Sequence, residues 1–468
     1  MAKSNTKKWI GLSIAAAVIL PSLFLPLPAG LTRAGLESLA LLFAGIVLWF
    51  CGSLPEGLSC MLLVALAGVM KIESTGTLFY KFGSSTFFFI LAMFAVAAAL
   101  ERTTIPIRVV NTILRVTRKS SRYLVLGFIT GSALLAAVMS SHVACCALFA
   151  KLADSIIRGK EGEGKSPYPN LAKCLMLSVS YGAGIGGFAT PTSTAANLLA
   201  VDILHTTVGI TVRYVDWLLV ALPICLISLA VCWLGLVHVF PPEEIPPAAL
   251  QAQLARAEEI GPLKTGDKRL VAVVCTMLVL WILSSWLPAI NTLVVAIFGM
   301  IFLFLPNIGM LEWKDFSREA NWNTIFFIGG VSALIFCITS SGASEWLVSL
   351  LTRPLGGLSP FVICLAAALS AWLLHAIIPM SSGIMTMLAI PFIGIAQASG
   401  VNPAYLLIII SYWAGFAILL PFDAVVMLAY RYGYYTIGDM LKSSVVPSVV
   451  INLSLAVLVP LLAGVCLR

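Results

Sequence analysis

Long apolar stretches run through almost the whole of this 468-residue chain, each bounded by charged residues or by proline and glycine. Crossing about 30 Å of hydrocarbon takes roughly 20 residues of helix. The uninterrupted stretches are 9–27, 35–53, 55–70, 86–100, 214–239, 269–287, 289–305, 322–340 and 444–466. Only 10% of the residues are charged, too few to cover a water-facing surface. We therefore predict an all-α polytopic membrane protein and exclude a disordered chain, a nucleic-acid binder and a disulfide scaffold.

Four further apolar regions are interrupted near their middle. They are 123–157, 172–204, 360–398 and 404–430, and they break at Ser140-Ser141-His142, around 184–194, from Pro379 to Gly383 and at Pro421. Non-helical backbone at membrane depth is tolerated only where it is buried in protein or lines a watery cavity. We therefore expect the four breaks to converge on one central site.

The lysines and arginines divide unevenly between the two faces of the membrane. If the spans alternate and each broken hairpin returns to the side it entered from, 22 of the 28 lie on the side of the N-terminus. Under the positive-inside rule the N-terminus is then cytoplasmic and the C-terminus outside, in a bacterial cytoplasmic membrane. The same parity results if the hairpins cross fully, so charge leaves open whether they are re-entrant or full spans.

Two charged segments qualify this topology. The first apolar run follows Lys3, Lys7 and Lys8, as a secretory signal would, but no convincing cleavage site follows and the run is long. We predict an uncleaved first span within 1–34.

The segment from Glu101 to Arg122 mixes cationic and aliphatic residues, which predicts an amphipathic helix on the inner membrane surface, with a plain cytoplasmic loop as the alternative.

A polar region with Pro-Pro pairs, 241–267, is predicted to be a cytoplasmic linker between two halves, 35–240 and 268–468. Both halves show spans, a broken hairpin with Ser-Ser at its break, an interrupted span and a final span. An odd number of spans per half makes the repeats inverted in the membrane. We expect about 11 transmembrane helices plus two re-entrant hairpins, 123–157 and 360–398. Discontinuous helices at matching positions of two inverted halves mark the binding site of a transporter.

Each break also exposes a helix N-terminus. Unpaired N–H groups and the positive end of the helix dipole favour an anion there, and hydroxyl groups add donors without a buried fixed charge. We predict that the residues binding the substrate are Ser140, Ser141, His142, Thr190, Thr192, Ser193, Thr194, Asn197, Ser381, Ser382 and Asp423. For Gly182, Gly184 and Gly186 close helix packing is the alternative role.

Several short runs carry a family resemblance. They are Gly329-Gly330 followed by Ser340-Ser341-Gly342-Ala343-Ser344-Glu345, Gly186-Gly187-Phe188-Ala189-Thr190, and Gly433 to Met440. Together with the order of spans and hairpins, they resemble the divalent anion:sodium symporter family over residues 35–466, more in architecture than in signature residues. The resemblance implies a homodimer with a scaffold domain and a transport domain that moves as an elevator. It also implies di- or tricarboxylates or sulfate as substrates.

The chain departs from the family at the turns. Family hairpins read Ser-Asn-Thr, where the Asn and Thr contact the substrate carboxylates and nearby backbone carbonyls hold sodium. Here the turns read Ser141-His142-Val143 and Ser381-Ser382-Gly383, and the interrupted spans read Thr194-Ala195-Ala196-Asn197 and Ala424-Val425-Val426-Met427. By resemblance, sodium is expected near Ser141, Gly187, Ser381 and Asp423. The departures leave open which anion is carried and whether coupling is to sodium, to protons or by exchange.

His142 and Asp423 are the ionisable residues at these turns, and ionisable groups within a membrane are functional candidates. An imidazolium at His142 would bind the anion in place of a sodium charge and couple transport to a proton; the alternative is a neutral His142 bonded to a backbone carbonyl. Asp423 would bind a cation or a proton, or pair with Arg431.

These features predict a secondary transporter of small multivalent anions, di- or tricarboxylates first, with sulfate or sulfonates as the alternative. A channel is less favoured, because two inverted halves do not surround a four-fold pore. An intramembrane enzyme is also less favoured, because His142, His205, His238 and His375 lie on different segments and form no catalytic cluster. Most of the eleven cysteines lie within apolar spans without a metal-ligand spacing, so we expect no cofactor apart from a coupling ion.

Overall fold

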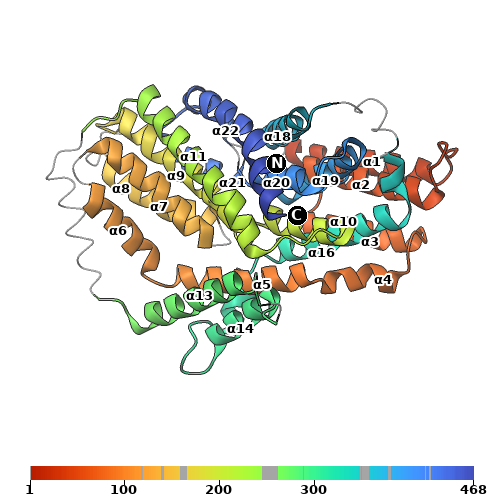
Figure 1. Cartoon of the computed structure of the whole chain (residues 1–468), viewed down its shortest axis with the longest axis horizontal. Coiled ribbons are helices and arrows are strands. Elements are labelled where there is room, and N and C mark those ends of the chain that lie inside the picture. Colours follow the sequence, from red (N-terminus) through yellow and green to blue (C-terminus); the bar gives the residue numbers. More distant parts are fainter. Residues whose placement is uncertain are drawn as a thin grey trace.

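The computed structural model describes residues 2–467 with the exception of 118–119, 139–141, 159–165, 245–261, 288, 348, 350–357, 378–380, 417 and 421–422. In these residues the chain forms helices and no strand (Figure 1). The helices are α1 (Ala2–Ser22), α2 (Arg33–Cys51), α3 (Glu56–Val69), α4 (Thr75–Tyr80), α5 (Ser85–Glu101), α6 (Ile105–Thr117), α7 (Ser121–Val138), α8 (His142–Ile157), α9 (Pro169–Ala189), α10 (Ala195–Val208), α11 (Tyr214–Val239), α13 (Thr265–Leu283), α14 (Thr292–Phe304), α15 (Trp313–Glu319), α16 (Trp322–Ser340), α18 (Pro360–Ile377), α19 (Ser381–Ser399), α20 (Pro403–Ala414), α21 (Ala424–Tyr430) and α22 (Ile437–Cys466).

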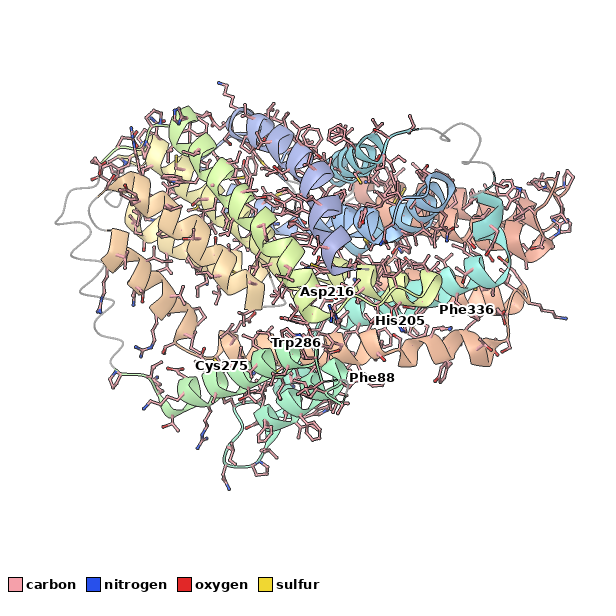
Figure 2. All side chains as sticks on the ribbon, in the orientation of Figure 1. Phe88, His205, Asp216, Cys275, Trp286 and Phe336 are labelled. Atoms are coloured by element: carbon pink, nitrogen blue, oxygen red, sulfur yellow. The ribbon has the colours of Figure 1, made fainter. Side chains whose placement is uncertain are left out.

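The predicted all-α membrane fold is confirmed. Among the described residues, eight helical segments are long and apolar enough to cross a membrane, and five shorter apolar helices accompany them. Large apolar side chains also face outward, as lipid requires: Phe88 and Trp286, labelled in Figure 2, are 43% and 62% exposed. Helices also form over most of the predicted spans 9–27 and 269–287: α1 ends at Ser22 and α13 at Leu283, and both have charged residues in their first turns.

All four predicted interruptions separate two helices. They lie between α7 and α8, α9 and α10, α18 and α19, and α20 and α21. Ser140 and Ser141, Pro379 and Pro421 lie outside the described residues. Ser381 is the first residue of α19 and His142 the first of α8, so the polar residues of both hairpins stand at helix N-termini.

Several helix starts differ from the apolar boundaries because polar side chains cap them. The last helix begins at Ile437 rather than at 444, since Thr436 Oγ1 accepts from Asp439 N at 3.1 Å and Asp439 Oδ2 accepts from Thr436 N at 3.0 Å. This reciprocal capping satisfies the first turn. Asp267 likewise accepts from Lys264 N, which starts α13 at Thr265 rather than 269.

The helices form two groups. The first helix group, α1 to α5 with α13 to α16, takes its members from the beginning of each half of the chain. The second helix group, α7 to α11 with α18 to α22, takes its members from the end of each half. Contacts within each group are extensive, whereas the groups meet mainly through α10 with α5 and α16, α11 with α13, and α19 with α2. Figure 1 shows α5 running below α11, with α4 at its other end beside α3.

Within the second helix group, the two halves exchange their short helices. The first half's α10 packs on α19 and α20, whereas the second half's α21 packs on α8 and α9. Each short helix follows one break and lies against the hairpin helix that follows another. This exchange brings helices from all four breaks together, as the sequence predicts.

Glycines allow α7 and α9, two helices of the first half, to pack closely. A Cβ atom on Gly182 would lie 2.2 Å from Ile129 O, and one on Gly186 would lie 2.1 Å from Ala133 O. A Cβ on Gly184 would meet the Phe416 ring. These three glycines therefore serve close packing, the alternative considered from the sequence.

The predicted amphipathic helix is present as α6, whose Ile105, Val109 and Ile113 pack on the core. Segments predicted to share the N-terminal face are also joined by polar contacts. Thr104 N donates to Asp267 Oδ1 at 3.1 Å, and Arg102 lies 3.2 Å from Asp315. Glu243, at the start of the polar linker, accepts from Asn170 N and Leu171 N at the N-terminus of α9.

We predict that Gly186→Ala destabilises the protein by about 1–3 kcal/mol, because the added methyl forces α9 away from the α7 backbone. The thermal midpoint of the detergent-purified protein measures this effect. Gly438→Ala is the matched control, since the nearest atom to its Cβ would be Thr436 Oγ1 at 3.7 Å. Equal midpoints for the two variants would contradict the packing role of Gly186.

Candidate functional site

A cavity of about 490 Å³ lies between the two helix groups. Its wall in the first helix group comes from α3, α5 and the start of α16, and its wall in the second group comes from the helices that follow the four breaks. The described lining residues are Glu56, Ile90, Met93, Phe94, Ala97, Ala98, Glu101, His142, Val143, Thr192, Ser193, Thr194, Ala195, Leu198, Asn321, Thr324, Ser381, Ser382, Gly415, Asp423, Ala424 and Val425.

Four helix N-termini meet at this cavity. The lining includes the first turn of α8 at His142, the start of α10 at Thr194, the start of α19 at Ser381 and the start of α21 at Asp423. Each N-terminus presents N–H groups without an intrahelical partner and the positive end of a helix dipole. The expected convergence of the breaks is thus seen at the level of individual residues.

The break between α9 and α10 is held by its own hydroxyl and amide groups. Ser193 Oγ donates to Gly187 O at 2.8 Å, and Asn197 Nδ2 donates to both Gly187 O and Thr190 O at 2.8 Å. Thr190 Oγ1 donates to Ala137 O of α7 at 3.0 Å. These bonds satisfy backbone carbonyls that lipid would leave unpaired, and they keep Thr192, Ser193 and Thr194 at the cavity.

The break before α21 is closed by Asp423. Its Oδ1 accepts from Val425 N at 2.8 Å and caps the helix, while its Oδ2 lies 3.5 Å from His375 Nε2 of α18. His375 is 1% exposed, and its Nδ1 bonds to Trp413 O of α20. The ion-pair partner of Asp423 is therefore His375; Arg431, the partner considered from the sequence, lies exposed beyond the other end of α21.

His142 packs its ring against the backbone of Gly187. A Cβ at Gly187 would lie 2.0 Å from His142 Cε1, so only glycine leaves room for the ring. The Nε2 atom is buried and has no hydrogen-bond partner within the part of the chain that the structure describes, and Asp423 is near enough to interact with the ring electrostatically. His142 thus sits between the first break and the carboxylate of the last one.

The charged residues of the described lining are all acidic. Glu56, Glu101 and Asp423 line the cavity, whereas the described lining contains no lysine or arginine. Glu56 accepts from Asn323 Nδ2 at 2.8 Å. The groups of the lining that favour an anion are therefore helix ends, hydroxyls and His142, whereas the carboxylates favour a cation.

The structure brings together seven of the residues predicted to bind substrate: His142, Thr192, Ser193, Thr194, Ser381, Ser382 and Asp423. Thr190 and Asn197 lie behind the cavity in the hydrogen-bond network of the break. Ser140 and Ser141 lie outside the described residues.

Sequence reasoning missed the opposite wall, with Glu56, Glu101 and Asn321, and it assigned no role to His375. The available signal was an ionisable residue at the edge of, or within, an apolar segment, which all three of Glu56, Glu101 and His375 satisfy.

The residues around which sodium was predicted differ in the oxygen atoms that they leave free. Gly187 O already accepts from Ser193 Oγ and Asn197 Nδ2, so both of its lone pairs are used. Asp423 uses one oxygen to cap α21 and turns the other to His375. Of the residues around which sodium was expected, Gly187 thus offers no free backbone oxygen, whereas Ser381 and Asp423 line the cavity and Ser141 lies outside the described residues.

Comparison with known proteins gives matches along the whole chain. A family model described as the sodium:sulfate symporter transmembrane region matches residues 6–467. A membrane protein of Cupriavidus necator is 25% identical over 440 residues, which cover 90% of this chain and 85% of that protein. The sodium-dependent high-affinity dicarboxylate transporter 3 of Caenorhabditis elegans is 24% identical, with 80% and 74% covered, and the sodium-dependent dicarboxylate transporter SdcS of Staphylococcus aureus is 23% identical, with 77% and 72% covered.

Solved structures share the fold. The YdaH transporter of Alcanivorax borkumensis superposes with a TM-score of 0.57 at 14% identity, covering 91% of this chain and 98% of that one. MtrF of Neisseria gonorrhoeae superposes with a TM-score of 0.55 at 12% identity, covering 97% and 94%. Because the family model spans nearly every residue, the resemblance found in the sequence is confirmed: the chain is a membrane transporter that belongs to the sodium:sulfate symporter family.

Proposed function

We propose that the protein carries a small dianion, a dicarboxylate in the first place, across the cytoplasmic membrane by secondary active transport. The observation that carries this proposal is the meeting of four helix N-termini at one cavity, with Thr192, Thr194, Ser381 and Ser382 beside them. A volume of about 490 Å³ suits a small metabolite with some water. The dicarboxylate specificity named for the Caenorhabditis and Staphylococcus relatives supports the same class.

The site explains how a dianion can leave water without being trapped. Each carboxylate loses strong hydration, and many individually weak donors must replace it. Backbone N–H groups and hydroxyls do so without a buried lysine or arginine, which would hold the anion too tightly for release. Sulfate, the substrate in the description of the family, is the second candidate, because the same donors suit its oxygens.

Coupling to a cation follows from the charge balance. A dianion entering a cavity with Glu56, Glu101 and Asp423 meets like charges, which costs free energy unless cations or protons enter with it. Sodium dependence is named for two relatives, and sodium is the first ion to test. Exchange against a second anion is the other mechanism that this charge balance allows.

The position of the cavity suggests how access alternates. It lies between two helix groups that share few contacts, so the second group can move past the first while keeping the four breaks together. We assign the first helix group as scaffold and the second as transport domain of an elevator, built from inverted repeats 35–240 and 268–468. By the same proposal the protein is a homodimer, is not an enzyme, and has a cytoplasmic N-terminus and an external C-terminus.

We predict that a dicarboxylate stabilises the purified protein against heat, because a ligand that binds only the folded state shifts unfolding by mass action. Succinate, malate, citrate, tartrate, sulfate and a sulfonate are compared by thermal shift, with sodium or with choline. A larger shift with succinate than with sulfate supports the dicarboxylate assignment. No shift with any anion would contradict the proposed function.

We further predict that Ser381→Ala weakens anion binding about ten- to a hundredfold, since one hydrogen bond to a charged group contributes about 1.5–3 kcal/mol. Uptake into proteoliposomes gives the apparent affinity. Ser317→Ala is the control, because Ser317 Oγ bonds only within α15, to Lys314 O. Unchanged affinity in Ser381→Ala would count against the site.

A further inference from the structure

His375 and Asp423 form a buried pair that the proposed transport function leaves without a role. They come from different helices, α18 and the start of α21, and meet at 3.5 Å between Nε2 and Oδ2. Among the described residues, His375 Nε2 has no other hydrogen-bond partner, and it is buried, whereas Asp423 reaches the cavity. His375 is thus shielded from the cavity, whereas Asp423 lines it.

The tautomer of His375 follows from its second contact. Its Nδ1 faces the backbone oxygen of Trp413, which can only accept, so Nδ1 must carry a hydrogen and donate it. Trp413 is itself fixed, because its Nε1 donates to Asn452 Oδ1 at 3.0 Å, and Asn452 Nδ2 donates to Ser448 O at 2.9 Å. The imidazole therefore cannot turn its Nδ1 hydrogen towards Asp423.

This tautomer creates a vacancy for one proton. In a neutral His375, Nε2 presents a lone pair, and it faces Asp423 Oδ2, which in an ionised carboxylate also presents only lone pairs. Two lone pairs that face each other in a buried site are unfavourable. A single proton between them turns the contact into a charge-assisted hydrogen bond, and it belongs to the pair rather than to either residue.

Few other groups compete for this proton. From α8, His142 and Cys146 face Asp423, and Cys146 Sγ donates to Val425 O at 3.2 Å. The described parts of α19 and α20, which pack against α18, contain no acidic or basic residue. On α22, Asp439 and Lys442 stand at the first turns, and Asp439 pairs with Lys173 of α9. Across the cavity stand Glu56 and Glu101.

Asp423 also occupies a position that the anion needs. Its carboxylate caps α21, one of the four N-termini at the cavity, so an ionised Asp423 repels a dianion beside it. Protonation of the pair removes one negative charge and leaves the cap in place. Anion binding and proton binding must then favour each other, since linkage between two sites is reciprocal.

We propose that His375 and Asp423 together bind a proton that accompanies the substrate, in the position where sodium was expected from the family resemblance. The proton enters from the cavity through Asp423 and is shared with His375 Nε2 while the anion is bound. This inference rests on the proposed function, because it names one of the coupling cations. Sodium at a different position is compatible with it.

The test measures succinate binding to the full-length purified protein by thermal shift at pH about 6.5 and about 8.5, where a dicarboxylate stays ionised. Sodium is held constant. If one proton is taken up with the anion, the apparent Kd rises about tenfold for each pH unit. A pH indicator in weakly buffered solution counts the protons, and we expect about one for each anion bound.

Two variants assign the proton to the pair. Asp423→Asn keeps the cap of α21, because asparagine is an equally good N-cap, and we expect its Kd to change less than about twofold over this pH range. His375→Asn leaves Asp423 without its partner and is also expected to lose proton uptake. His238→Asn is the control, since His238 is exposed near the end of α11, and it should behave as the wild type does.

The outcomes separate the two proposals. Wild-type protein that binds no anion at either pH overturns the proposed function and this inference with it. Wild-type protein that binds succinate without taking up a proton overturns the proton site alone. Full proton uptake and full pH dependence in both Asp423→Asn and His375→Asn would also overturn it.

Discussion

The need to satisfy every backbone polar group inside a lipid bilayer governs this structure. A helix interrupted at membrane depth leaves N–H and C=O groups unpaired, and each costs several kcal/mol in hydrocarbon. The chain has four such interruptions, and they survive because they are gathered in protein around one cavity. Side chains complete the pairing. Asn197 and Ser193 donate hydrogen bonds to backbone carbonyls at the end of α9, and Asp423 accepts one from a backbone N–H at the start of α21. The site follows from the same arrangement that makes the breaks tolerable.

The meeting of the four breaks at one cavity also determines the electrostatic character of that cavity. Helix N-termini favour an anion, whereas the carboxylates of Glu56, Glu101 and Asp423 oppose one in the same cavity. We propose that a site with both tendencies binds an anion well only when a cation or a proton is present. Transport coupled to a gradient needs an anion affinity that depends on the coupling ion. A site that bound the anion equally well without that ion would let the gradient dissipate.

Much of the fold could be predicted from the sequence, because apolar length and its interruption report directly on the bilayer. Proline, glycine and paired serines marked the four breaks, and seven of the predicted residues reach the cavity. The helix starts at Ile437 and Thr265 could not be read from hydropathy, since capping by Asp439 and Asp267 extends them into polar sequence. His375 was missed because it lies in the apolar part of 360–398 ahead of the break rather than at the break, and its partner Trp413 is 38 positions away. Glu56 and Glu101 could not be assigned to the cavity from the sequence, because they reach it only when α3 and α5 are packed against the second helix group.

The central claim is that the ends of α8, α10, α19 and α21 bind one anion together. A structure of the protein with bound succinate tests it most directly. The account predicts ligand density between these four N-termini, with carboxylate oxygens about 2.7–3.2 Å from backbone N–H groups or from the hydroxyls of Thr194, Ser381 and Ser382. Density for the anion elsewhere, for example within the first helix group alone and out of contact with these N-termini, would contradict the account.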